Sequence, residues 1–100
     1  MYVRFAVFML KDDHPNRFMH YEWAMTHGGI NLNDYHFVYR GEIEVSPFAS
    51  ETAMLEAVYR LLNTRHPADY HARSLSVSDM VKLDDIGTFF CDSVGFKQIG

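Results

Sequence analysis

The chain has little cysteine and little positive charge, and both shortages limit the classes of protein to which it can belong. Its single cysteine, Cys91, cannot close an internal disulfide, so a reducing compartment such as the cytoplasm is the simplest expectation. Nine lysines and arginines stand against 13 aspartates and glutamates, a net charge of −4 that argues against a generally basic, nucleic-acid-binding surface. The first apolar run, YVRFAVFML, contains Arg4, lacks a signal cleavage site and has roughly half the length of a membrane span. We therefore interpret it as a buried strand.

Signatures of catalysis, metal binding and phosphate binding are also missing. The chain contains no GxSxG, GxGxxG or GxxxxGK[ST] motif, and its six histidines show no HxH, HxxxH or HExxH spacing. His66, Asp69 and His71 could meet around an ion, although exposed loop histidines are the commoner arrangement. Cys91 lies in an apolar strand pattern, which is typical of an inert, buried thiol. We expect no cofactor, no metal site and no enzymatic activity.

What the chain does contain is apolar periodicity that predicts a small α+β domain. With 48% hydrophobic and 15% aromatic residues, 100 residues can bury a core as one domain spanning 1–100. The first strand is apolar on both alternating faces, as in a central strand, and the last three strands read as a β-meander joined by DDIG and DSVG turns. The expectation is a mostly antiparallel sheet with two short helices packed on it. Strands are expected at 2–11, 34–45, 80–83, 88–91 and 96–99, and helices at 18–27 and 50–64.

Capping and turn residues set the expected boundaries of these elements. Asn16 is expected to cap the first helix, although the aromatic residues there also permit a strand start. Gly41 interrupts the second strand, as a bulge or a tight turn. Ser50 is expected to cap the second helix, and Asn63 to close its last turn in a left-handed conformation before Pro67.

The stretch HPADYHARSLSVSDM, residues 66–80, concentrates polar groups between two apolar segments. Ser76 and Asp79 have the spacing of a capping box, which predicts a single helical turn with reciprocal side-chain to backbone bonds. On this interpretation the polar groups are used locally, as serines and aspartates in turns usually are. The catalytic alternative pairs Asp79 or Cys91 with His71.

Several segments together resemble the YodL-like domain family. LEAVYRLLNTRHPADYHARSLSVSDMVKL followed by FFCDSVGFKQI carries the resemblance in the second half, through the SLSVSD and DSVGF motifs in that order. VFMLKDD and NDYHFVYRGEI fit the family's first two strands, so the resemblance covers nearly the whole chain. It implies a bacterial domain often found in proteins of plasmids, conjugative elements or phages, and it implies no particular activity. The resemblance implies that the family-pattern positions act as caps, as turn residues and, in one case, as an aromatic side chain that fills the core. These positions are Ser74, Ser76, Ser78, Asp79, Asp92, Gly95 and Phe96.

The leading functional hypothesis is a non-enzymatic protein-interaction or accessory module of a mobile-element protein. The expected contact surface is residues 65–78, where Arg65, Tyr70 and Arg73 are of the types that anchor interfaces. Four glutamates and no lysine or arginine lie between Gly41 and Tyr59, and the arginines follow. The alternative is therefore a nucleic-acid-binding accessory domain that uses Arg60, Arg65 and Arg73 with Tyr70 stacking on bases. The leading hypothesis expects a protein partner and no membrane.

Overall fold

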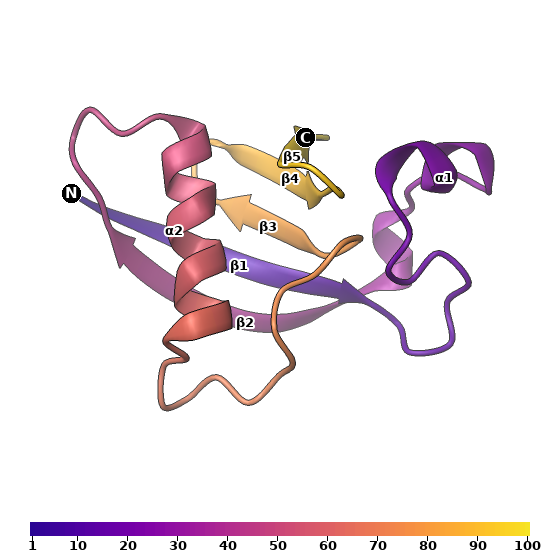
Figure 1. Ribbon diagram of the computed structural model, residues 1–100, viewed down its shortest axis with the longest axis horizontal. Coiled ribbons are helices and arrows are strands. Elements are labelled where there is room, and N and C mark those ends of the chain that lie inside the picture. The colour runs from indigo at the N-terminus through magenta and orange to yellow at the C-terminus, as the bar shows by residue number, and fades with distance from the viewer.

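One five-stranded antiparallel sheet, in the order β2-β1-β3-β4-β5, forms the framework of the protein (Figure 1). The computed structural model describes residues 1–100. A three-residue 3-10 turn, η1, precedes the second strand. The elements are β1 (Tyr2–Leu10), α1 (Tyr21–Thr26), η1 (Leu32–Asp34), β2 (Tyr35–Glu44), α2 (Glu51–Thr64), β3 (Met80–Leu83), β4 (Gly87–Cys91) and β5 (Phe96–Gln98). The predicted α+β class, with two helices and a C-terminal meander, is confirmed.

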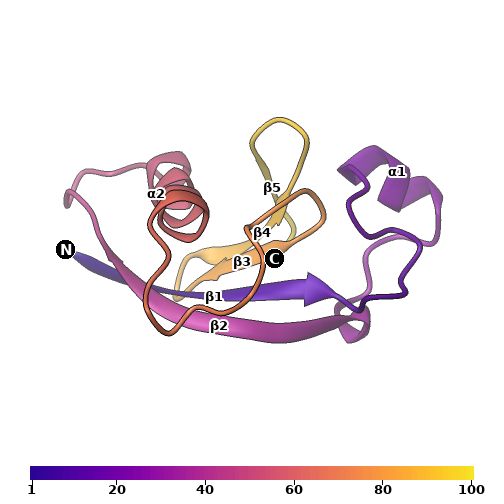
Figure 2. The same cartoon turned by 60° about the horizontal axis from the view of Figure 1, so that its bottom comes forward.

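Strand β1 is an interior strand of the sheet, since it pairs with β2 on one side and with β3 on the other. Its alternate residues point to opposite faces, and the face that includes Phe5 and Val7 lies under α2 (Figure 2). Helix α2 buries an apolar stripe against this face, as its helical spacing predicts. The side chains that α2 contributes to the core are Met54, Leu55, Val58 and Leu62.

The opposite face of the sheet is charged at one end and covered at the other. Near the start of β1 it carries exposed ion pairs, Arg4 with Glu42 and Arg40 with Asp84. At the other end the segment that contains α1 lies against β4 and buries Phe90, whose ring meets that of Tyr21 edge-on at 5.7 Å between centroids. The small domain therefore buries apolar side chains on both sides of its sheet.

Helix α1 is shorter than predicted and has a different cap. Phe18 has a φ of +66°, outside the helical region, so the helix cannot begin there. His20 is the N-cap and accepts a hydrogen bond from the amide of Trp23. Asn16, the expected cap, is buried and instead donates to the carbonyl of His27, tying the start of this segment to its end.

Gly41 and Asn63 also differ from their predicted roles. The extra residue of β2 is Val38, where the register against β1 shifts, so Gly41 is not the bulge. Gly41 lies under two aromatic rings: a Cβ there would be 2.7 Å from Tyr39 Cε2 and 2.8 Å from Phe5 Cζ. Asn63 is helical, because α2 continues to Thr64.

Candidate functional site

The most connected polar group in the protein is the carboxylate of Asp79, which is fully buried at the end of the long polar loop. Both guanidinium nitrogens of Arg73 donate to it, Nη2 to Oδ1 at 2.7 Å and Nη1 to Oδ2 at 2.8 Å. The amide of Ser76 donates to Oδ2 at 2.7 Å. Burial raises the pKa of Asp79, and the Arg73 guanidinium opposes that rise. The carboxylate in turn raises the pKa of Arg73. Three donors on two oxygens form the environment of an ionised carboxylate.

Half of the predicted capping box forms, but the helical turn does not. The Asp79 carboxylate reaches back to the amide of Ser76 as expected. The amide of Asp79 donates to the carbonyl of Ser76 at 3.1 Å rather than to its hydroxyl. Ser78 has a φ of +81°, so residues 76–79 make a tight turn with a left-handed residue at its third position.

Ser78 also shows that the loop's polar groups are not used only locally. Its hydroxyl accepts from the amide of Phe18 at 2.9 Å, and its carbonyl accepts from the hydroxyl of Tyr35 at 2.6 Å. Its amide donates to the carbonyl of Cys91. Burial, with a contribution from Asp79, raises the pKa of Tyr35. One serine therefore joins three distant parts of the chain.

Tyr70 and Arg73, two of the three residues predicted to form the contact surface, are both engaged within the fold. The Tyr70 side chain is 5% exposed, packs edge-on against Tyr39 and donates its hydroxyl to the carbonyl of Arg73 at 2.5 Å. Arg73 keeps some exposure, but its guanidinium is held by Asp79 and lies 4.6 Å from the centroid of the Phe18 ring. The prediction is wrong for Tyr70, which is buried, because the loop folds inward to satisfy a buried carboxylate. Arg73 still lines a surface groove, but its charge is paired with Asp79.

The loop is fastened to α2 by the amide side chain of Asn63. Asn63 Nδ2 donates to the carbonyl of Leu75 at 3.0 Å, and its Oδ1 accepts from the Leu75 amide at 2.7 Å. The Asn63 side chain thus satisfies both backbone groups of Leu75, as a neighbouring strand would. Because no backbone group is left without a partner, Leu75 can be almost completely buried.

The remaining family-pattern positions also have structural roles. Asp92 Oδ1 accepts from the amides of Tyr21 and Ser93, so the turn between β4 and β5 holds the first residue of α1. Gly95 has a φ of +71° in that turn. Phe96 packs against the core, and Ser74 contributes its carbonyl as an acceptor for Arg73.

The residues named for a catalytic alternative lie in dissimilar environments. Cys91 is buried, and burial, aided by Asp79 and Asp92, raises its pKa to about 12. Such a thiol is protonated at neutral pH and is a poor nucleophile. His71 is exposed. No three histidine, cysteine, aspartate or glutamate side chains come together in a way that could hold a metal ion.

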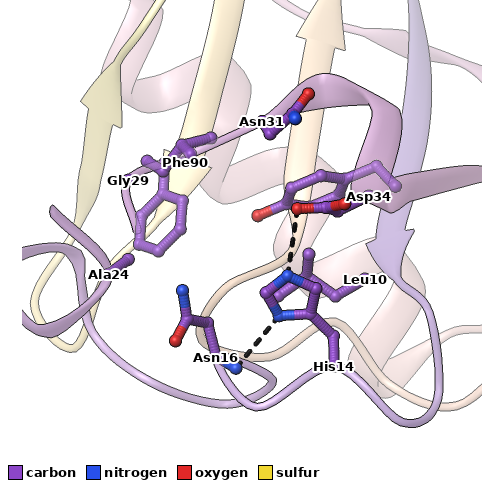
Figure 3. Close-up of a pocket in the computed structure, with 10 residues that line it drawn as sticks. Leu10, His14, Asn16, Ala24, Gly29, Asn31, Asp34 and Phe90 are labelled. Atoms are coloured by element: carbon purple, nitrogen blue, oxygen red, sulfur yellow. Dashed lines mark hydrogen bonds and ion pairs between the residues drawn. The ribbon is translucent and has the colours of Figure 1, made fainter. Parts of the chain in front are cut away.

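A small cavity beneath α1 is a packing junction rather than a ligand pocket. Its volume is about 10 Å³, which is on the scale of one water molecule (Figure 3). His14 spans it: Nδ1 accepts from the amide of Asn16, so Nε2 carries the proton and donates to Asp34 at 3.0 Å. Ala24 and Phe90 close the opposite side.

Two of the larger surface grooves are each lined by two arginines, and these grooves differ in whether the arginines are paired. The groove beside Arg73, about 480 Å³, also contains Arg17, which lies 3.7 Å from Asp12. The second groove, about 500 Å³, lies between the C-terminal half of α2 and the end of β2, and its arginines are Arg60 and Arg65. The protein's ion pairs are Arg4–Glu42, His14–Asp34, Arg17–Asp12, Arg40–Asp84 and Arg73–Asp79.

Arg60 and Arg65 are therefore free cations on an open surface, while Arg73 is not. Glu42 and Glu44 also line this groove, but neither carboxylate lies within 4.0 Å of a guanidinium of α2. Ala57, Leu61 and the buried Ile43 give the groove an apolar floor. We call the surface formed by residues 42–44, 57, 60, 61, 64 and 65 the α2–β2 groove. It combines apolar contact area with two cations that are available to a ligand.

A five-stranded antiparallel sheet with one long helix on one face and a short capping segment on the other defines the class of this α+β domain. Residues 4–100 match the family model of the YodL-like domain, so the chain belongs to that family. No curated protein and no solved structure matches the chain. Neither helix has the length and apolar content that crossing a membrane requires.

Proposed function

We propose that the protein is a non-enzymatic interaction module of a bacterial mobile-element protein, acting in the cytoplasm, and that its contact surface is the α2–β2 groove. The observation that carries the proposal is the pair of unpaired arginines, Arg60 and Arg65, above an apolar floor. Interfaces characteristically combine arginine with apolar contact area in this way. Arg65 keeps its predicted binding role, while Arg60 replaces Tyr70 and Arg73 as its companion.

The non-enzymatic part of the proposal is supported by how the reactive groups are used. The Asp79 carboxylate accepts hydrogen bonds from Arg73 and from the Ser76 amide, and the Cys91 thiol is buried in a strand. The cytoplasmic setting agrees with a lone, reduced cysteine. The mobile-element setting rests on family membership alone.

Nucleic acid binding has less support than protein binding. Tyr70 is buried and cannot stack on a base, and the charge of Arg73 is neutralised by Asp79. Arg60 and Arg65 remain, but two arginines offer few phosphate contacts in a chain whose net charge is −4.

A pull-down from a lysate of a bacterium that carries the protein, with and without nuclease, tests the proposal. The baits are the wild-type chain, Arg60→Ala/Arg65→Ala, and a matched control, Lys11→Ala/Lys82→Ala. The control removes two exposed positive charges outside the groove. We expect one protein that survives nuclease, binds wild type and control, and is lost with the arginine variant.

Three results would contradict the proposal. A partner retained equally by all three baits would place the contact elsewhere on the surface. A signal that disappears with nuclease would replace the protein partner by nucleic acid, and no retained protein at all would remove the interaction role.

A further inference from the structure

One edge of the sheet has an open row of backbone groups beside the α2–β2 groove. Strand β2 pairs only with β1, in antiparallel register. Met1 and Val45 exchange backbone bonds, so hydrogen-bonded pairs recur at every second residue from there, at Ile43 and Gly41. The residues between them turn their amides and carbonyls away from β1. These outward-facing residues are Arg40, Glu42 and Glu44.

Nothing in the fold pairs with this row. None of the backbone hydrogen bonds outside the regular elements involves Arg40, Glu42 or Glu44. The hydrogen bonds between the polar loop and β2 come from two tyrosine hydroxyls of that strand: Tyr35 donates to the carbonyl of Ser78, and Tyr39 donates to Asp69 at 2.8 Å. Neither bond uses the backbone between Arg40 and Glu44. Figure 2 shows β2 along the outer edge of the sheet with α2 on one face. The open stretch therefore runs from Arg40 to Glu44, beside the end of α2 that carries the free arginines.

We propose that this edge accepts an extended segment of a partner protein as a sixth strand, with carboxylate side chains directed at Arg60 and Arg65. The inference rests on the proposed function, since it specifies how a partner occupies the α2–β2 groove. Strand addition supplies main-chain hydrogen bonds for affinity, and pockets for alternate side chains supply specificity. Here the groove meets one face of the added strand, so every second side chain of the partner enters it.

Charge decides which strand fits. Two unpaired cations in a partly apolar groove favour a segment with acidic residues at every second position, so that its acidic side chains face α2. Basic residues at those positions are disfavoured. A second copy of β2 is a poor occupant, because its residues on the α2 face are Tyr39, Gly41 and Ile43, none of them acidic. Such pairing would also bring the free arginines of two α2 helices to one interface. The occupant is therefore a foreign, acidic, extended segment.

The test separates backbone pairing from side-chain contact with two substitutions at one position. Glu42→Pro removes an amide that points to solvent, where an edge strand tolerates proline, and so blocks a sixth strand. Glu42→Ala removes the same carboxylate and keeps the amide. Circular dichroism and thermal melting confirm that each variant is folded. A random dodecapeptide display library, panned on the wild-type chain, supplies the peptide probes.

The expected result is a family of peptides with acidic residues at alternate positions. These bind Glu42→Ala as they bind wild type, and bind Glu42→Pro and Arg60→Glu/Arg65→Glu at least about tenfold more weakly, the effect of one lost interface hydrogen bond or more. Peptides that bind Glu42→Pro unchanged would overturn strand addition while leaving the interaction role and the groove intact.

Three other outcomes would also overturn the inference. These are no enriched peptide family, a family without acidic residues, and competition by a second copy, seen as wild-type dimerisation in sedimentation that Glu42→Pro abolishes. The failure of strand addition can be distinguished from the failure of the proposed function. The lysate experiment tests whether the arginines bind a protein partner, and its result does not depend on the amide of Glu42.

Discussion

Replacing Arg73 by alanine should be among the most damaging single substitutions in the protein. Asp79 is fully buried, and Arg73 supplies two of its three hydrogen bonds. Breaking a buried ion pair by removing one partner costs about 3–5 kcal/mol. Because the Arg73 side chain is 29% exposed, water can replace part of it, and we expect a loss at the lower end, about 3 kcal/mol. The arginine also leaves the Phe18 ring, which adds a cation–π contribution of about 0.5 kcal/mol.

Urea unfolding at pH 7 measures this loss, and a double-mutant cycle with Asp79→Ala shows its origin. If the two residues act on each other, the double variant should be more stable than the sum of the single losses predicts, by about 2 kcal/mol. Arg73→Lys should recover part of the stability, because it keeps the charge and loses the two-pronged geometry. A loss below about 1 kcal/mol for Arg73→Ala, or no coupling in the cycle, would refute the assignment of Asp79 as a buried anion that depends on Arg73.

The pH dependence of Arg73→Ala follows from the same buried carboxylate. Burial raises the folded-state pKa of Asp79, and without the Arg73 guanidinium only the Ser76 amide and the charge of Arg17 oppose that rise. Between the unfolded and the folded pKa the folded state then binds more protons than the unfolded state, so stability falls as pH rises through this window. The deficit of the variant relative to wild type should therefore be smaller at pH 5 than at pH 7. An equal deficit at both values would contradict the ionised state of the carboxylate.

The remaining predictions concern three other positions. Asn63→Ala should cost about 1–2 kcal/mol in urea unfolding, because it removes both bonds that hold the polar loop to α2, whereas an unchanged midpoint would mean that the loop holds itself. Gly41→Ala should cost about 1–3 kcal/mol, since a Cβ would lie 2.7 Å from Tyr39 and 2.8 Å from Phe5, and a neutral result would show that the rings move aside freely. Cys91 should not react with a thiol reagent at pH 8 in the folded protein and should react fully in urea, because burial raises its pKa to about 12. Rapid labelling of the folded chain would contradict its burial.

The layout of the fold could be predicted because it depends on local patterns. The two apolar faces of β1 predicted a central strand, and the stripe along α2 predicted the face it buries. Ser50 caps α2 as its residue type suggests, by accepting from the amide of Ala53. These features need only neighbours in sequence, so periodicity and capping preferences determine them.

The predicted roles of polar residues were wrong where a side chain bonds to a residue distant in sequence instead of to a neighbour. Asn16, Asn63 and Ser78 are all types that cap or turn locally, yet each bonds to backbone at least 11 residues away. Local capping and long-range bonding satisfy the same donors and acceptors, so residue type cannot distinguish them. Two positive-φ residues, Phe18 and Ser78, are joined by one of these bonds. Tertiary contacts impose both conformations.

The candidate site divides in the same way. The sequence by itself determined the kind of domain, the family, and a set of three candidate arginines, Arg60, Arg65 and Arg73. Only the tertiary structure decided that Arg73 neutralises the buried Asp79 while Arg60 and Arg65 stay free in the α2–β2 groove. The physical reason is that a buried carboxylate must be paired, whereas an exposed arginine gains little from pairing and remains available to a partner.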